Sequence, residues 1–139
     1  MSKINFSNFV QIAGIIDQQE AELLTTNGVK FLGFPLRLPV NKEDLTEQEA
    51  SDIIKKLEPP NFGVVISYSS TAAEAIELCD KLYSSIIQLH GPIEIEELSR
   101  LKRERPDITI IKSLVISEDN IDELKTSIRS LEKYVDAFI

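Results

Sequence analysis

Cysteine and histidine are nearly absent from this sequence, which contains one of each, Cys79 and His90. A single cysteine excludes a disulfide bond within the chain and favours the reducing cytoplasm as the compartment. One cysteine and one histidine also speak against a dedicated zinc site within one chain. Cys79 occupies an apolar position of a predicted helix, so we expect it in the hydrophobic core rather than in a reactive site.

Positive charge and long apolar runs are also scarce. The chain has 15 Lys and Arg against 23 Asp and Glu, a formal net charge of −8, which would repel nucleic acid and anionic membranes. No apolar run approaches the roughly 20 residues that cross a bilayer, and the N-terminus lacks the apolar middle of a signal peptide. We therefore expect neither a nucleic-acid nor a membrane partner.

Glycine-rich phosphate-binding motifs are missing as well. The first apolar run, "QIAGIID", contains one glycine, Gly14, where a dinucleotide-binding fingerprint needs three. No P-loop sequence occurs either. These absences weaken the case for a nucleotide-binding protein.

What the sequence does contain is a regular alternation of apolar runs and helical patterns. The helical stretches open with capping-box patterns at Asp17 to Glu20, Thr46 to Glu49 and Thr71 to Glu74. Pro92 suits the first residue of a fourth helix, and a fifth of about 15 residues is expected from Ser117. The predicted strands are residues 9–15, 30–36, 62–68, 85–91, 108–115 and 134–139.

Successive strand–helix units require a parallel sheet with helices outside it. The two architectures that fit are an open doubly wound sheet and a (β/α)8 barrel. A barrel normally takes about 200–250 residues, so residues 1–139 would form a single partial domain that continues beyond Ile139 if the chain is truncated. Otherwise partner chains, such as further copies in a homo-oligomer, would cover the sheet edges.

Polar residues at the carboxyl ends of these strands are the candidate site, because parallel architectures bind ligands there. Gln88 and His90 share one strand face, because side chains alternate along a strand. A histidine at this position is as often a hydrogen-bonded structural group as a functional one. Lys112, flanked by Ile110 and Ile111, either reaches the strand end with its amino group or meets an anion.

These strand ends resemble those of the phosphoribosylanthranilate isomerase family of tryptophan biosynthesis. The similarity is carried, in order, by "VQIAGIIDQQEA", "LGF", "GVVIS", "IIQLHG", "IIKSL" and "VDAFI". It implies a (β/α)8 TIM barrel, of which this chain covers about strands one to six. It also implies an Amadori (aldose–ketose) isomerisation of an N-linked phosphoribosyl substrate, with a general acid, a general base and no cofactor or metal.

The resemblance assigns a pocket and departs from the family at the catalytic positions. Gly14, Gln88, His90 and Lys112 match and would bind the phosphorylated substrate. Gln11 stands where the family has a lysine, and Lys42 is the nearest counterpart of a substrate-binding arginine, with Arg37 second. The family's cysteine base corresponds to Ala13. Its aspartate acid would fall about two residues beyond Ile139. Asp136 is not its counterpart, because it precedes the apolar run of the last strand and should lie at the amino-terminal end of that strand.

Two functions therefore remain. The first is an isomerase of this family, with His90 as a replacement base, because histidine side chains exchange protons near neutral pH. The second is a catalytically impaired barrel that binds an anionic, phospho-sugar-like ligand or a protein partner.

Overall fold

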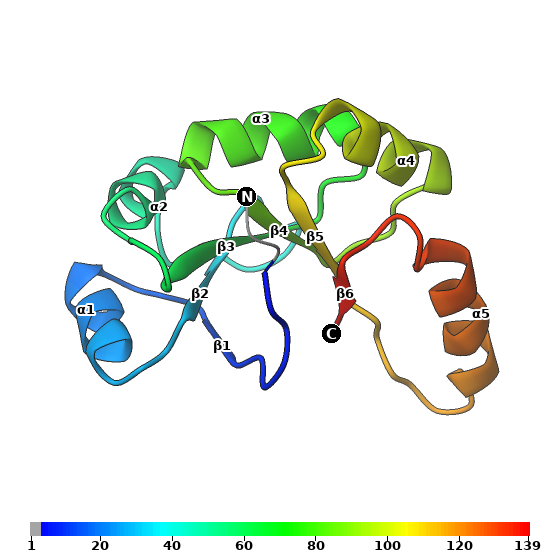
Figure 1. Cartoon of the computed structure of the whole chain (residues 1–139), viewed down its shortest axis with the longest axis horizontal. Helices are drawn as coiled ribbons and strands as arrows, with labels where there is room; N and C mark the ends of the chain where they lie inside the picture. The colour runs from blue at the N-terminus through cyan, green and yellow to red at the C-terminus, as the bar shows by residue number, and fades with distance from the viewer. Residues whose placement is uncertain (1–3) are drawn as a thin grey trace.

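The computed structural model describes residues 4–139 as a six-stranded parallel sheet whose strands follow their sequence order. Five helices alternate with the strands, as the sequence predicts (Figure 1). The strands are β1 (Gln11–Ala13), β2 (Phe31–Pro35), β3 (Phe62–Ser67), β4 (Ile86–Leu89), β5 (Thr109–Lys112) and β6 (Ala137–Phe138). The helices are α1 (Gln18–Thr26), α2 (Glu47–Ile54), α3 (Ala72–Leu82), α4 (Ile95–Glu104) and α5 (Ile121–Leu131).

The sheet curls into part of a barrel. Its helices lie around the outer, convex side, and its concave side faces away from them (Figure 1). Each strand pairs with the next one in the chain, and the order never reverses. A doubly wound sheet requires such a reversal at its switch point. The structure therefore decides between the two architectures in favour of the barrel type.

The predicted helix N-termini are confirmed for the first three helices. Asp17, Thr46 and Thr71 are the N-caps, and each side chain accepts a hydrogen bond from the backbone N–H three residues later. Only Thr46 forms the complete capping box, in which the Glu49 side chain also accepts the backbone N–H of Thr46. The Glu20 and Glu74 carboxylates instead accept from the residue before the cap, the N–H groups of Ile16 and Ser70.

Several predicted boundaries are wrong, among them those of β5 and β6, which cover Thr109–Lys112 of the expected 108–115 and Ala137–Phe138 of the expected 134–139. Pro92 is not the first residue of a helix, because α4 begins at Ile95 with Glu94 as its N-cap. Helix α5 begins at Ile121 rather than Ser117: the Asn120 side chain bonds the backbone of Ser117 and Val115 and holds this stretch as a loop. Strand β1 covers three residues of the expected 9–15.

Strand β1 is short because the chain turns at both of its ends. Before it, the Phe9 N–H donates to the Phe6 carbonyl in a turn. After it, Gly14 adopts a φ of +83°, a left-handed conformation that glycine accepts without strain. The carbonyl of Gly33 then takes the N–H groups of both Gly14 and Ile15.

Two apolar clusters lie on the two faces of the sheet. The larger one lies between the sheet and the helices, where Leu32, Val65 and Ile87 meet residues such as Leu78 of α3. The smaller one fills the concave face and is closed from the amino-terminal side by the first segment of the chain. It contains Phe31, Val64, Ile66, Ile86 and Ile111, with Ile4, Phe6, Phe9, Phe62 and Ala137 packed against them.

Cys79 lies in the larger cluster, as predicted, and is 1% exposed. Burial raises the pKa of its thiol to about 12, because an apolar environment disfavours the thiolate. The chain's one thiol is therefore unsuited to proton abstraction. Over residues 4–139, no helix combines the length and the apolar character needed to cross a membrane.

Candidate functional site

A line of hydrogen-bonded side chains crosses the concave face near the carboxyl ends of the strands. The Gln11 Nε2 of β1 donates to the Gln88 Oε1 of β4 over 2.9 Å, although these strands are not neighbours in the sheet. The Gln88 Nε2 in turn donates to the Ser113 Oγ over 3.0 Å. Gln88 and Ser113 are each 7% exposed. Two predicted site residues, Gln11 and Gln88, are thus brought together, with Ser113 as a third member.

The Oε1 oxygen of the Gln11 carboxamide takes no part in this line of hydrogen bonds. It is buried and has no hydrogen-bond partner among residues 4–139. A buried acceptor without a donor is costly, and it favours a ligand that supplies an N–H or O–H group. A hydroxyl-bearing ligand would satisfy this requirement.

His90 lies directly after β4, on the same side of the strand as Gln88. Its backbone N–H donates to the Ser67 carbonyl over 2.9 Å, which fixes its position at the strand end. Its ring is half-buried and packs edge-on against the Tyr68 ring, 5.0 Å away between centroids. Among the described residues, its ring nitrogens have no hydrogen-bond partner. The imidazole is thus held by packing, with its nitrogens available to a ligand.

Gly91 allows this arrangement. A Cβ atom at position 91 would lie 3.0 Å from the Tyr68 Cδ1 atom. A larger residue would therefore push the Tyr68 ring and, with it, the His90 imidazole.

Lys112 lies on the other face of the sheet. Successive residues of a strand point to opposite faces, and Ile111 belongs to the concave cluster. Lys112 therefore points to the same face as Ile110, which packs against the helices. Its side chain is 8% exposed, and its Nζ donates to the carbonyls of Ser113 (2.9 Å) and Leu89 (3.3 Å). No carboxylate pairs with it among residues 4–139. The predicted anion contact of Lys112 therefore stays a prediction.

Replacing Lys112 by methionine is expected to raise the melting temperature at pH 7. Burial lowers the pKa of the Lys112 ammonium below its ordinary value, because desolvation disfavours the charge. The resulting cost to folding is complete below the lowered pKa and disappears as the pH rises to the ordinary lysine pKa of about 10.4. The gain from K112M should therefore shrink between neutral pH and about pH 10, as measured by thermal unfolding. The exposed Lys56→Met is the control, and a pH-independent difference would contradict the explanation.

The loop between β2 and α2 contains both cations considered for an anion contact. Arg37, with φ +51°, bonds Glu47 of α2 (2.6 Å) and Glu77 of α3 (2.7 Å). This ion pair lowers the pKa of Glu47 to about 2, chiefly through the hydrogen bond from Arg37. Arg37 therefore anchors the loop. Lys42 is exposed and takes part in no ion pair among residues 4–139, so it remains the cation of this loop that is available to a ligand.

Asp44 is a candidate site residue that sequence reasoning missed. A Cβ built on Gly14 would lie 3.7 Å from the Asp44 Oδ2 atom, so this exposed carboxylate lies beside the end of β1, next to Ala13. The loop is fixed just before it by a 3.0 Å bond from the Leu38 N–H to the Glu43 Oε1. The sequence shows Asp44 only as one acid in a charged loop, and the fold alone brings it to β1.

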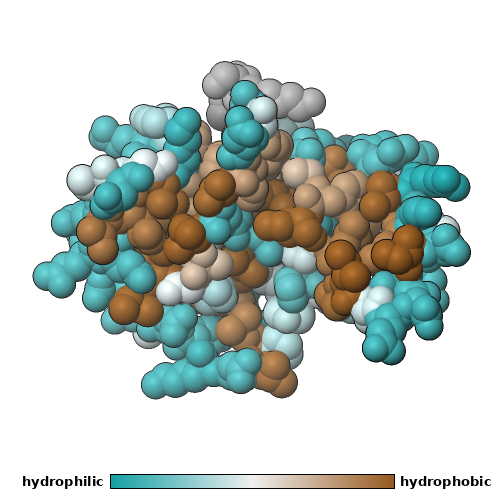
Figure 2. Space-filling view, turned by 90° about the horizontal axis from the view of Figure 1, so that it is seen from below, coloured by the Kyte–Doolittle hydropathy of each residue, from teal (hydrophilic) through white to brown (hydrophobic). Residues whose placement is uncertain are grey.

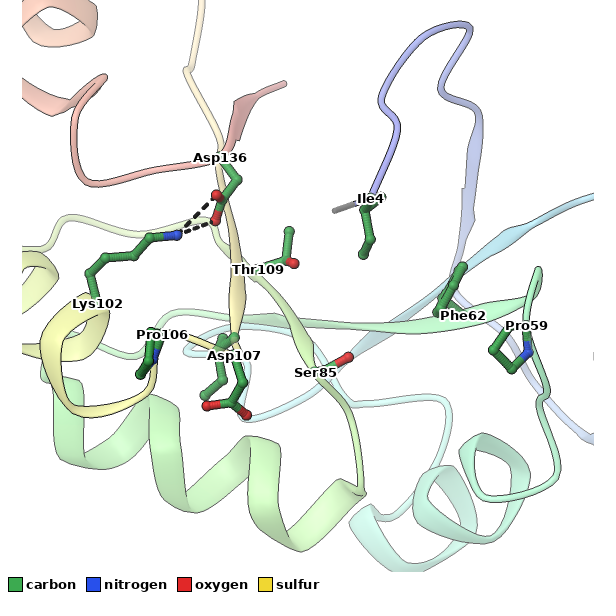
Figure 3. A pocket seen from close by; sticks show the side chains of 10 residues that line it. Ile4, Pro59, Phe62, Ser85, Lys102, Pro106, Asp107, Thr109 and Asp136 are labelled. Carbon is green, nitrogen blue, oxygen red and sulfur yellow. Dashed lines mark hydrogen bonds and ion pairs between the residues drawn. The ribbon is translucent and has the colours of Figure 1, made fainter. Parts of the chain in front are cut away.

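A cavity lies at the opposite end of the sheet. It measures about 750 Å³ and is lined near the strand starts by Phe62, Ser85, Thr109 and the Lys102–Asp136 ion pair (Figure 3). The Asp136 carboxylate also accepts the Ile110 N–H and so ties the start of β6 to β5, in agreement with its predicted place at the strand start. In (β/α)8 folds this end carries stabilising residues. None of the predicted site residues lines it.

Removing the Gln88 carboxamide is expected to destabilise the fold. Gln88→Leu leaves the Gln11 amide and the Ser113 hydroxyl without their partner, and unpaired buried polar groups cost about 1–3 kcal/mol each. Urea unfolding measures the loss. Gln48→Leu is the matched control, because its amide bonds Asp52 on an exposed helix surface. Equal stability of the two variants would show that the buried network contributes nothing.

No group of three or more His, Cys, Asp or Glu side chains in residues 4–139 is arranged to hold a metal ion. The candidate site therefore consists of the Gln11 and Gln88 amides, the Ser113 hydroxyl and the His90 imidazole. The loop between β2 and α2 adds the Lys42 cation and the Asp44 carboxylate. This set can hold a polar, anionic small molecule and can exchange a proton with it.

Comparisons with known proteins point to one family, although no family model matches the chain. It is 29% identical to the N-(5'-phosphoribosyl)anthranilate isomerase of Methanothrix thermoacetophila over 73% of this chain and 49% of that protein. It is 27% identical to the enzyme of the same name from Methanosarcina acetivorans, over 94% of this chain and 58% of that protein. The chain thus spans about half the length of the curated relatives it matches.

Solved structures give the same answer for the fold. The phosphoribosyl anthranilate isomerase of Thermotoga maritima superposes with a TM-score of 0.75 at 22% identity, over 91% of this chain and 58% of that one. A phosphoribosyl anthranilate isomerase in complex with reduced 1-(o-carboxyphenylamino)-1-deoxyribulose 5-phosphate superposes with a TM-score of 0.73 at 19% identity, over 92% and 72%. The similarity in fold supports the expected six-strand portion of a TIM barrel. Sequence similarity and fold together show that this chain is related to phosphoribosylanthranilate isomerases and shares their fold.

Proposed function

We propose that the chain forms the greater part of a phosphoribosylanthranilate isomerase site, which converts an N-linked phosphoribosyl substrate to its ketose isomer. The observation that carries the proposal is the Gln11–Gln88–Ser113 line beside His90, at the carboxyl ends of the strands of a barrel from this family. Substrate hydroxyls would donate to the free Oε1 atom of Gln11, and Lys42, in the loop between β2 and α2, would pair with an anionic group of the substrate. The single, buried thiol suits the cytoplasm, the proposed compartment.

The reaction requires two proton transfers that the fold must provide. An acid protonates the ring oxygen so that the ribose opens to a Schiff base. A base then removes the C2 proton, and the C–H electron pair moves toward the iminium nitrogen to form the enolamine. Ala13 offers no proton acceptor. In the described structure His90 and Asp44 are the two groups near the strand ends that can take this proton.

The experiment is a direct assay of the purified chain. Phosphoribosylanthranilate is supplied, and its fluorescence is followed beside a reaction that contains buffer alone. Loss of the signal above the buffer rate supports the isomerase. An unchanged signal over hours, at protein concentrations comparable with the substrate, would contradict it.

A second function, ligand binding without catalysis, is favoured by one specific observation: the inert side chain of Ala13 beside an otherwise built pocket. Here the expected ligand is an anionic, phospho-sugar-like molecule. Calorimetry with the reduced carboxyphenylamino-deoxyribulose phosphate tests this, because the compound cannot react. Binding without turnover would select this function, and Gln88→Leu should then weaken the binding.

A further inference from the structure

His90 and Ser113 are the first residues after β4 and β5, and both belong to the candidate site. One backbone hydrogen bond holds each of them to the preceding strand. The His90 N–H donates to the Ser67 carbonyl over 2.9 Å. The Ser113 N–H donates to the Leu89 carbonyl over 3.1 Å. The positions of both side chains therefore depend on how the backbone is held at the ends of these two strands.

The ammonium group of Lys112 adds hydrogen bonds at the same place. Its Nζ donates to the Ser113 carbonyl over 2.9 Å and to the Leu89 carbonyl over 3.3 Å. The Leu89 carbonyl and the His90 N–H belong to one planar peptide group. Ser113 and Lys112 hold this group at its oxygen, and Ser67 holds it at its nitrogen. The peptide group that precedes the His90 side chain is thus fixed on both sides.

Lys112 makes these bonds from the face of the sheet opposite the candidate site. It points to the same face as Ile110, which packs against the helices, and it is 8% exposed. On the concave side, apolar atoms are spread between hydrophilic rims (Figure 2). The ammonium can therefore hold the two strand ends without occupying the space of a ligand.

A lysine in this position is costly for the fold. Burial lowers the pKa of the Lys112 ammonium, because desolvation disfavours the charged form. Backbone carbonyls compensate a buried charge only in part. Methionine, an unbranched apolar side chain, would fill the space without that cost. Stability alone therefore does not explain the lysine, whereas proteins do give up stability where a site requires it.

We propose that Lys112 is a positioning residue, whose ammonium holds the carboxyl ends of β4 and β5 in place and thereby places the His90 imidazole and the Ser113 hydroxyl for a ligand. This role differs from the anion contact predicted from the sequence, because Lys112 acts on the ligand only through other residues. Its effect on turnover rests on the proposed isomerase function, but its effect on the backbone does not.

The test is native-state hydrogen exchange of Lys112→Met. The amides of His90 and Ser113 should exchange at least about tenfold faster than in the parent, because the strand ends open more often. The amides in the middle of β4 and β5 should not exchange faster, since the melting temperature of this variant rises. Lys56→Met, which removes an exposed lysine, is the control and should leave all of these rates unchanged.

Lys112→Gln separates the hydrogen bonds from the charge. Its side-chain amide keeps two N–H donors, so His90 and Ser113 should exchange within about threefold of the parent rates. Exchange as fast as in Lys112→Met would overturn the proposal, because N–H donation would then not hold the strand ends. Unchanged exchange in Lys112→Met would overturn it as well.

The isomerase assay then distinguishes positioning from anion binding. Lys112→Met should lower kcat at least about tenfold and leave KM within about threefold, because the misplaced His90 acts on substrate that is already bound. A raised KM with unchanged kcat and unchanged exchange would support the anion contact and contradict the positioning role. A parent chain without turnover would contradict the isomerase function alone, and the exchange rates would still decide the role of Lys112.

Discussion

Replacing His90 by alanine is expected to abolish isomerisation, with a loss of at least about 100-fold in turnover, the usual contribution of a general base. The ring is fixed at the end of β4 by the Tyr68 ring and the Ser67 carbonyl, and its nitrogens are free toward the site. Gln88, two residues earlier, forms the Gln11–Gln88–Ser113 hydrogen bonds on the same face of the strand. Fluorescence loss of phosphoribosylanthranilate under single-turnover conditions measures the effect.

Two further variants separate proton transfer from packing. His90→Gln keeps a polar side chain of similar size but cannot act as the base, so it should be as inactive as His90→Ala while its melting temperature stays close to that of the parent. Asp44→Asn removes the competing carboxylate beside Gly14 and should reduce turnover far less. Full activity of His90→Ala together with inactive Asp44→Asn would transfer the role of base to Asp44.

Truncating Leu78 to alanine is expected to destabilise the fold by about 3 kcal/mol, within the range measured for buried leucines. Leu78 is 0% exposed and packs from α3 into the cluster between the helices and the sheet. A loss of this size is a large share of the roughly 5–15 kcal/mol that keeps a domain folded. Urea unfolding monitored by circular dichroism measures it.

Leu23→Ala provides the comparison, because it removes the same atoms from a helix position that is 63% exposed. It should change the stability by less than about 1 kcal/mol. Similar losses in the two variants would mean that α3 does not pack on the sheet as described.

The strand–helix order was predictable from the sequence because it depends on local physics. Apolar runs of strand length and helix caps act within a few residues, and the caps at Asp17, Thr46 and Thr71 lie where they are predicted. The misplaced starts at Pro92 and Ser117 show the limit of that reasoning. Before α5, the hydrogen bond from the Asn120 side chain to the Val115 carbonyl competes with the helical pattern.

The site was predictable only in part. Alternation along one strand places Gln88 and His90 on one face without any tertiary information. The 2.9 Å contact of Gln88 with Gln11 required the curvature of the sheet, because their strands are not neighbours. The approach of Asp44 to β1 required the anchored loop.

The sequence by itself determined the parallel β/α class, the family resemblance and the residue types at the strand ends, because all three depend on local pattern and composition. The tertiary structure decided that the sheet curls in sequential order, that Lys112 faces the helices and that Arg37 holds a loop. It also showed that, within residues 4–139, β1 pairs only with β2 and β6 only with β5. These properties depend on contacts between residues far apart in the chain, which no local pattern specifies.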